Sequence, residues 1–356
     1  MKWLIIFPDP WICYSPSIIN FTKMLDINSQ DYIVFYFDDG SFDNSKFNFN
    51  AIPIKLKKGF FVNFFRRIKI LGFIKIILFL YVILKEIKPS EYQKIVGVDS
   101  LGYIIARFFS KKIIYYSLEV SKNRVNKIIF SKKRPDFLII QSVSRLNYLA
   151  KGFSEVGFIQ NSPILSSTQF YKRFYEGKLL YLGNIVKEHG VEICIESLYF
   201  MNEETLYIKG IGDARYIESL KEKYRDLYLT KRFVIDNIYV EQEDLFNFIK
   251  DFDVGFCLYD FEEIGRSYNY QSSPSGKMFN YFMASMPVIG NNIIGLNLVH
   301  EHDAGVLLDN VSSKGIVRAV HEIKENYLNF SLNAYDVAHI YDYEKMFMSN
   351  WNKLTR

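Results

Sequence analysis

The sequence has few of the residues that build disulfide frameworks and zinc sites. Its 356 residues include only three cysteines, Cys13, Cys194 and Cys257, which lie far apart and form no Cys-x-x-Cys motif. The five histidines add no metal set, because His300 and His302 stand too close together to share a helix face and no paired acids accompany them. We therefore expect a chain that works in the reducing cytoplasm, with no metal site and no cofactor.

Long apolar runs are also missing. The N-terminal run from Met1 to Phe7 meets Pro8-Asp9-Pro10 at once, which leaves it too short for the central region of a signal peptide. The longest run, from Ile76 to Leu84, lies between two lysines and falls well short of the about 20 residues that a spanning helix needs. We expect no segment that crosses a membrane.

Acidic residues are absent between Ser45 and Lys85, although the net charge of the chain is only +5. Such a stretch favours an anionic partner. Since no nucleic-acid-binding motif accompanies it, we expect an anionic membrane surface through residues 45–85 and no nucleic acid, with a solvated basic face as the alternative. The basic residues are Lys46, Lys55, Lys57, Lys58, Arg66, Arg67, Lys69, Lys75 and Lys85.

A long helix is predicted over about Phe60 to Lys85, within this basic stretch. It fits two interpretations. It is either a partly buried helix that packs on a sheet, or a helix whose phenylalanines and neighbouring arginines enter the interface of an anionic leaflet. Both interpretations can be true of different turns of the helix. The residues of the second interpretation are Phe60, Phe61, Phe64, Phe65, Arg66, Arg67 and Lys69.

Short β-branched and aromatic runs alternate with helical segments twice along the chain, a pattern typical of parallel sheets wrapped by helices. The chain is also too long for one ordinary core. A Ser- and Pro-containing segment, Asn161 to Thr168, separates the two series. We predict strands at 3–7, 32–37, 94–98, 112–116, 137–141 and 157–160, and then at 179–182, 205–208, 232–238, 254–259, 287–289 and 305–308.

The segment from Ser272 to Gly290 predicts a helix that runs into a strand, because Phe279, Phe282, Met283 and Met286 recur at helical spacing. Ser273, Ser275 and Gly276 leave backbone N–H groups unpaired at the start of this helix, and Lys277 adds a full charge. A diphosphate would fit there, and an ordinary capped helix is the alternative. A lysine at this position is expected to be exposed unless a phosphate covers it.

A second segment, Tyr181 to Val191, predicts a strand that ends in Gly183, a polar turn with Asn184 and Lys187, and a helix from about Gly190. Glycine after a strand lets the backbone approach a phosphate or a sugar, and ligands of open α/β sheets lie beyond the carboxyl ends of the strands. The turn is therefore a candidate ligand site.

Together the two segments resemble the C-terminal, donor-binding domain of the GT-B glycosyltransferases, most nearly of the retaining family 4 type. The likeness covers roughly residues 179–310. Where that family commonly has two glutamates separated by seven residues, this chain has Ser272 and Asn280, and asparagine can still hydrogen-bond a hydroxyl. The matching residues are Gly183, Ser273-Pro274, Lys277, Phe279, Tyr281, Met283-Ala284, Pro287-Val288-Ile289, Gly295 and Gly305 to Asp309.

The resemblance implies an α/β fold of two Rossmann-like domains that face a central cleft. Residues 1–165 would form the acceptor-side domain, on which a C-terminal helix at about 338–356 packs back, and residues 175–337 the nucleotide-sugar donor domain. The donor would be bound by Gly183, Asn184, Lys187, Ser273, Ser275, Gly276, Lys277 and Asn280.

The resemblance also points to a catalytic or sugar-contacting carboxylate. Many family members place a His or Glu where Glu119 follows the strand-like segment 113–116. Asp99 is the second candidate, because it follows the strand predicted over 94–98 and stands at the same edge of the sheet. For both acids the alternative is a solvated residue at the end of a strand.

The function implied is the metal-independent, retaining transfer of a sugar from a nucleotide-sugar donor to a glycan or lipid-linked acceptor. We expect it in bacterial surface polysaccharide synthesis, in the cytoplasm or on the inner face of the membrane. The alternatives are a nucleotide-sugar epimerase and a non-catalytic protein that binds nucleotide sugars.

Overall fold

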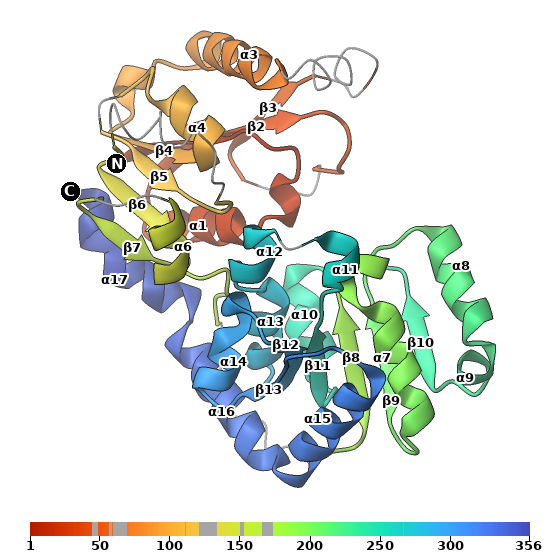
Figure 1. The fold of residues 1–356 in the computed structure, drawn as a ribbon. Coiled ribbons are helices and arrows are strands. Elements are labelled where there is room, and N and C mark those ends of the chain that lie inside the picture. The colour runs from red at the N-terminus through yellow and green to blue at the C-terminus, as the bar shows by residue number, and fades with distance from the viewer. Residues whose placement is uncertain are drawn as a thin grey trace. The chain divides into compact units, whose positions relative to one another are not determined.

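The computed structural model describes residues 1–44, 49–56, 59, 70–110, 112–120, 134–149, 153–165, 174–265 and 267–356. The chain divides into two compact units, each built on one parallel sheet with helices on its faces (Figure 1). Unit 1 contains Met1–Asn161 and Tyr343–Arg356, and unit 2 contains Ser162–Asp342.

Unit 1 has a seven-stranded sheet in the order β3-β2-β1-β4-β5-β6-β7, and every neighbouring pair is parallel. The central strands are apolar on both faces, as expected of strands that helices cover on both sides. The strands are β1 Lys2–Phe7, β2 Asp31–Asp38, β3 Ala51–Lys55, β4 Lys94–Val98, β5 Ile114–Tyr116, β6 Phe137–Ile140 and β7 Val156–Phe158. The helices are η1 Ile12–Tyr14, α1 Pro16–Ile27, α3 Leu71–Glu86, η2 Pro89–Glu91, α4 Asp99–Ala106, α6 Val143–Leu149 and α17 Tyr343–Thr355.

Unit 2 has a six-stranded sheet in the order β10-β9-β8-β11-β12-β13, again wholly parallel. The strands are β8 Lys178–Leu182, β9 Thr205–Lys209, β10 Phe233–Asp236, β11 Val254–Cys257, β12 Val288–Asn291 and β13 Gly305–Leu308. The helices are η3 Lys187–His189, α7 Val191–Ser197, η4 Leu198–Phe200, α8 Ala214–Lys223, α9 Arg225–Leu229, α10 Gln242–Ile249, α11 Phe261–Ile264, α12 Tyr268–Ser272, α13 Gly276–Met283, η5 Ile294–Leu296, α14 Asn297–Glu301, α15 Ser313–Glu325 and α16 Tyr327–Ile340.

The predicted α/β fold class is confirmed, but one strand was missed. β3 contains Pro53 at its centre, and proline lacks the N–H that a central strand must donate. β3 is an edge strand that pairs only with β2, so the missing donor costs no ladder bond on its open side.

The last helix differs from the predicted segment 338–356. α16 ends at Ile340 and the chain breaks at Tyr341–Asp342, so the C-terminal helix is α17 and begins at Tyr343, later than predicted. Within unit 1, the Tyr343 hydroxyl lies 3.2 Å from the Tyr116 hydroxyl and donates to the backbone carbonyl of Ser17 at 3.2 Å. α17 is thereby fixed to the rest of that unit.

The described part of the predicted helix 60–85 is α3, because residues 60–69, with their phenylalanines and Arg66, Arg67 and Lys69, lie outside the described residues. α3 buries Phe79 and Ile83 and exposes an apolar stripe formed by Phe73, Ile77, Tyr81 and Leu84, each at least half exposed. Within the described chain, no helix combines the length and apolar character needed to cross a bilayer.

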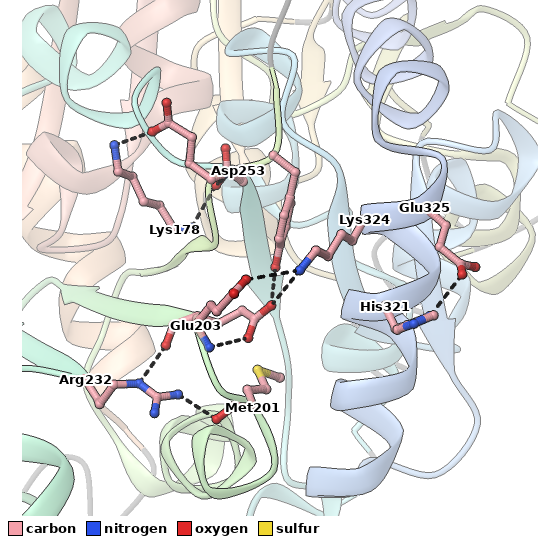
Figure 2. A network of polar contacts seen from close by, with 11 residues as sticks. Lys178, Met201, Glu203, Arg232, Asp253, His321, Lys324 and Glu325 are labelled. Atoms are coloured by element: carbon pink, nitrogen blue, oxygen red, sulfur yellow. Dashed lines mark hydrogen bonds and ion pairs between the residues drawn. The ribbon is translucent and has the colours of Figure 1, made fainter.

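Polar contacts close the amino-terminal edge of the unit 2 sheet (Figure 2). The Asp253 carboxylate accepts the backbone N–H groups of Glu176 at 3.0 Å and Lys178 at 2.8 Å. Arg232 donates to three backbone carbonyls, and Lys324 of α15 lies 3.5 Å from the Glu203 carboxylate. These groups hold β8, β9, β10 and β11 together at this edge, and a ligand site of an open parallel sheet is expected at the opposite, carboxyl edge.

Candidate functional site

The candidate site in unit 2 starts where β8 ends. Gly183 follows that strand with φ of +125°, a conformation that residues with a side chain rarely adopt. Its N–H donates to the Lys209 carbonyl at 2.9 Å, and the Tyr181 hydroxyl donates to the Asn184 carbonyl at 2.6 Å. The backbone of the turn is therefore held open at the carboxyl edge of the sheet.

α13 packs on β11, the neighbour of β8 in the sheet, and begins near this turn. Leu182 N–H donates to the Tyr281 hydroxyl at 2.9 Å, and that hydroxyl donates to the Phe256 carbonyl at 3.3 Å, so Tyr281 ties α13 to both β8 and β11. A Cβ on Gly255 would lie 2.3 Å from the Tyr281 ring, and only glycine leaves that ring its place. The helix starts at Gly276, and Ser275 before it makes no side-chain capping hydrogen bond.

The predicted buried face of this helix needs one correction. α13 ends at Met283, and Ser285 has a positive φ of +56°, so Met286 lies beyond the helix, although its side chain is buried. The four residues that α13 itself buries are Met278, Phe279, Tyr281 and Phe282.

Lys277 does not extend into solvent, and its predicted exposure is wrong. The side chain as a whole is half-buried, but its Nζ is inaccessible and has no hydrogen-bond partner among the described residues. A Cβ on Gly183 would lie 3.1 Å from Lys277 Cδ and 3.6 Å from Nζ, so the lysine folds over the glycine turn. Nζ lies 5.0 Å from the ring centre of Tyr181 and 5.7 Å from that of Tyr259. Burial lowers the pKa of Lys277.

His189 is a further candidate site residue, which was not predicted from the sequence. It ends the turn η3, and its ring packs edge-on against Tyr259 with 5.5 Å between ring centres. Its Nδ1 is buried and has no hydrogen-bond partner in the described structure. Burial and the Lys277 charge lower the pKa of His189 to about 4, against a hydrogen bond with the backbone of Asn184 that raises it. Its place directly before Gly190, in the turn that already contained the candidate residues, was the available signal.

The remaining donor-site candidates lie around the same edge. Asn184 and Lys187 are exposed on the turn, and Asn280 is half-buried one helical turn after Gly276. Ser273 precedes α13, and a Cβ on Gly295 would lie 2.3 Å from the Ser273 carbonyl oxygen. Close contacts thus join Gly183 directly to Lys277.

A cavity of about 410 Å³ opens farther along this edge, beyond β12 and β13. Amide side chains and one carboxylate provide its polar groups, and a phenylalanine and aliphatic side chains the rest. Among the described residues no lysine or arginine lines it, so it suits an uncharged ligand rather than a phosphate. Its lining residues are Phe261, Gln271, Asn291, Asn292, Ile293, Ile294, Asn297, Leu308 and Asp309.

In unit 1 the structure brings the two candidate acids together. Asp99 has φ of +51°, and its Oδ1 accepts the backbone N–H groups of Leu118 and Glu119, both at 2.8 Å. Burial raises the pKa of Asp99 well above its usual value, and the hydrogen bond from Glu119 opposes this. The Asp99 carboxylate therefore holds the loop after β5 in place.

Glu119 is exposed, but the protein on one side of it partly desolvates its carboxylate and raises its pKa, which the charge of Arg145 opposes. Arg145 was not predicted as a site residue. It is fully buried, and its Nη2 donates to the Leu118 carbonyl at 2.6 Å, next to Glu119. Asp9, after β1, adds a third carboxylate whose charge raises the pKa values of both other acids.

Across the described ranges, no three or more His, Cys, Asp and Glu side chains gather in a way that would hold a metal ion.

No protein-family model and no curated protein matches the sequence, whereas many solved structures match the fold. The chain is similar to sucrose-phosphate synthase from Thermosynechococcus elongatus, with a TM-score of 0.71, 15% identity and coverage of 99% of this chain and 98% of that one. It is similar to HepE of Anabaena in complex with UDP and glucose (TM-score 0.70, 12% identity, 100% and 99% coverage). It is also similar to the pneumococcal O-GlcNAc transferase GtfA in complex with UDP and GlcNAc (0.68, 10%, 100% and 98%). The chain has the GT-B fold.

Proposed function

We propose that this chain is a glycosyltransferase that takes a sugar from a nucleotide-sugar donor and passes it to a glycan or lipid-linked acceptor. The observation that carries the proposal is the Lys277 ammonium, which is buried beside the Gly183 turn and has no hydrogen-bond partner in the part of the chain that the structure describes. A buried charge without a partner is costly, and a diphosphate at the turn would supply the missing partner. UDP complexes of two proteins with the same fold support the nature of this ligand.

The chemistry follows from where charge develops. As the sugar leaves, negative charge grows on the diphosphate, and donors already fixed in a desolvated site stabilise it most effectively. Lys277 Nζ and the uncapped N–H groups at the start of α13 are such donors, and Gly183 lets the phosphate come close to the backbone. These groups make the transfer independent of a metal ion, and we propose that it retains the anomeric configuration.

The sugar itself needs uncharged partners. The amide-lined cavity at the same sheet edge has a volume within the about 300–1,000 Å³ typical of ligand pockets. Gln271 and Asn297 line it, and amides both donate to and accept from hydroxyl groups. We assign the hydroxyl-rich part of the donor to it.

Unit 1 would serve the acceptor and unit 2 the donor. Glu119 is exposed with a raised pKa, which suits a carboxylate that contacts a sugar, whereas Asp99 acts on Glu119 by holding its backbone N–H. Asp99 is therefore a positioning residue in this proposal.

The acceptor side also has a feature that suits a lipid-linked substrate in surface polysaccharide synthesis. The α3 stripe of Phe73, Ile77, Tyr81 and Leu84 is exposed, and it lies within the acid-free segment 45–85. Apolar side chains beside basic ones bind anionic membrane interfaces. Lys75 does not contribute, because its Nζ donates to the Pro8 carbonyl at 2.7 Å and is turned inward.

Incubation of the pure protein with UDP- and GDP-sugars and glycan or lipid-linked acceptors tests the enzymatic proposal. Acceptor-dependent release of nucleoside diphosphate is the expected result. A new sugar isomer would instead indicate epimerisation, and binding without turnover a non-catalytic binding protein. The membrane proposal is tested by sedimentation with anionic and neutral vesicles.

We expect binding to anionic vesicles only, weakened by salt and lost in Phe73→Glu with Tyr81→Glu. Leu229→Glu is the matched control, because Leu229 is an equally exposed apolar residue in unit 2. Vesicle binding by the double variant at the level of the unmodified chain would remove α3 from the membrane site.

A further inference from the structure

His189 and Lys277 form a pair of buried nitrogens at the Gly183 turn. Each has a side-chain nitrogen that is inaccessible to solvent and has no hydrogen-bond partner among the described residues, His189 Nδ1 and Lys277 Nζ. Both side chains lie against Tyr259, at 5.5 Å and 5.7 Å from its ring centre. Buried polar atoms are normally hydrogen-bonded, so two of them without a partner at one turn indicate a ligand rather than an ordinary capped helix.

The hydrogen bonding of His189 shows which ring nitrogen is able to take up a proton. The ring hydrogen-bonds the backbone of Asn184, and Nδ1 is the nitrogen without a partner, so Nε2–H donates to Asn184 in the neutral ring. Nδ1 then carries a lone pair and cannot donate to an anion until it takes up a proton.

Charged side chains are carried by η3, by the helices α7 and α11 that pack against it, and by α13, whose Lys277 acts on His189. Lys277 belongs to α13, Glu188 to η3 itself, Glu262 to α11, and Glu192 to α7, where its carboxylate is paired with Lys223 at 2.5 Å. Of these, only Lys277 acts appreciably on the pKa of His189, and it lowers it. Burial is the larger cause of the low pKa of His189 and the Lys277 charge is the second, so an anion bound beside both side chains offsets the second cause and itself favours the protonated ring.

We propose that donor binding is coupled to proton uptake by His189, which becomes a second cationic donor to the diphosphate beside Lys277. The proton comes from solvent as the nucleotide sugar binds and returns to solvent when the nucleotide leaves. The inference rests on the proposed nucleotide-sugar function and adds a pH-dependent control to it.

The test uses calorimetric titration of the full chain with UDP-glucose and GDP-mannose near neutral pH. Their diphosphate diesters do not titrate there, so any proton taken up belongs to the protein. Repeating the titration in two buffers of different ionisation enthalpy gives the number of protons bound. We expect uptake approaching one proton and a Kd that weakens by up to about tenfold per pH unit as pH rises.

Three variants separate the causes. His189→Gln should bind more weakly, without proton uptake and with no pH dependence, and His189→Lys should bind tightly, also without uptake. His321→Gln is the control, because His321 is exposed on α15 and pairs with Glu325. Melting curves of each variant show whether it folds.

The outcomes distinguish this inference from the function on which it rests. If neither nucleotide sugar binds the unmodified chain, both proposals fail. If a nucleotide sugar binds without proton uptake, or if folded His189→Gln retains the pH dependence, only the coupling is overturned.

Discussion

Lys277→Met separates the effect of the buried ammonium on stability from its effect on nucleotide binding. Methionine keeps the length of the side chain and removes the charge. A buried donor without a partner costs about 1–3 kcal/mol, and more if charged, so the ligand-free variant should be more stable than the unmodified chain. For a domain of 150–250 residues, each kcal/mol shifts the melting temperature by roughly 2–4 °C, so the rise should be several degrees. Unit 2, Ser162–Asp342, is of this size.

The same change should abolish the stabilisation by nucleotides. A ligand that binds only the native state raises its melting temperature by mass action, and the variant has lost the cation that holds the diphosphate. The assay is a thermal melt with and without UDP and GDP. Lys314→Met is the matched control, since Lys314 is also the second residue of its helix but is exposed. A less stable Lys277→Met variant that still responds to nucleotide would refute the reasoning.

Three further predictions follow from individual residues. Gly183→Ala should weaken nucleotide binding, because its methyl group would meet Lys277 Cδ at 3.1 Å and the positive φ strains alanine; Gly40→Ala, with φ of +74° and open space around it, should lose stability but not binding. Asp99→Ala should lower the free energy of unfolding by about 1–3 kcal/mol in urea melts, because two backbone N–H groups lose their acceptor. Asp99→Asn should cost less, because asparagine keeps Oδ1 and tolerates φ of +51°. Equal losses of stability in the two variants would contradict the role of Oδ1 in holding the loop after β5. The pKa of His189 is lowered from 6.5 to about 4 in the folded chain, so ligand-free stability should fall as pH drops through that window, by on the order of 3 kcal/mol. His189→Gln should flatten that part of the stability profile.

The two-sheet fold was predictable because buried parallel strands give continuous apolar runs. β4 and β13 were predicted with the bounds that the structure has. β3 was not, because Pro53 is a strong signal against a central strand and sequence alone does not tell that this strand lies at an edge.

The candidate site residues were suggested by local signals, but their detailed arrangement was not. Gly183 and the start of α13 carry local signals, a glycine after a strand and a serine-rich helix start. The inward path of Lys277 depends on the space that Gly183 leaves and on two tyrosines from β8 and from beyond β11, which are far apart in sequence. His189 gave no periodic signal, and its importance arises only from burial beside Lys277.

The most direct test of the account is a crystal structure of the chain with UDP or GDP bound. The account predicts a diphosphate against the Gly183 turn, with a phosphate oxygen within hydrogen-bond distance of Lys277 Nζ. A nucleotide bound with its phosphates away from this turn, and Lys277 Nζ still without a partner, would contradict it.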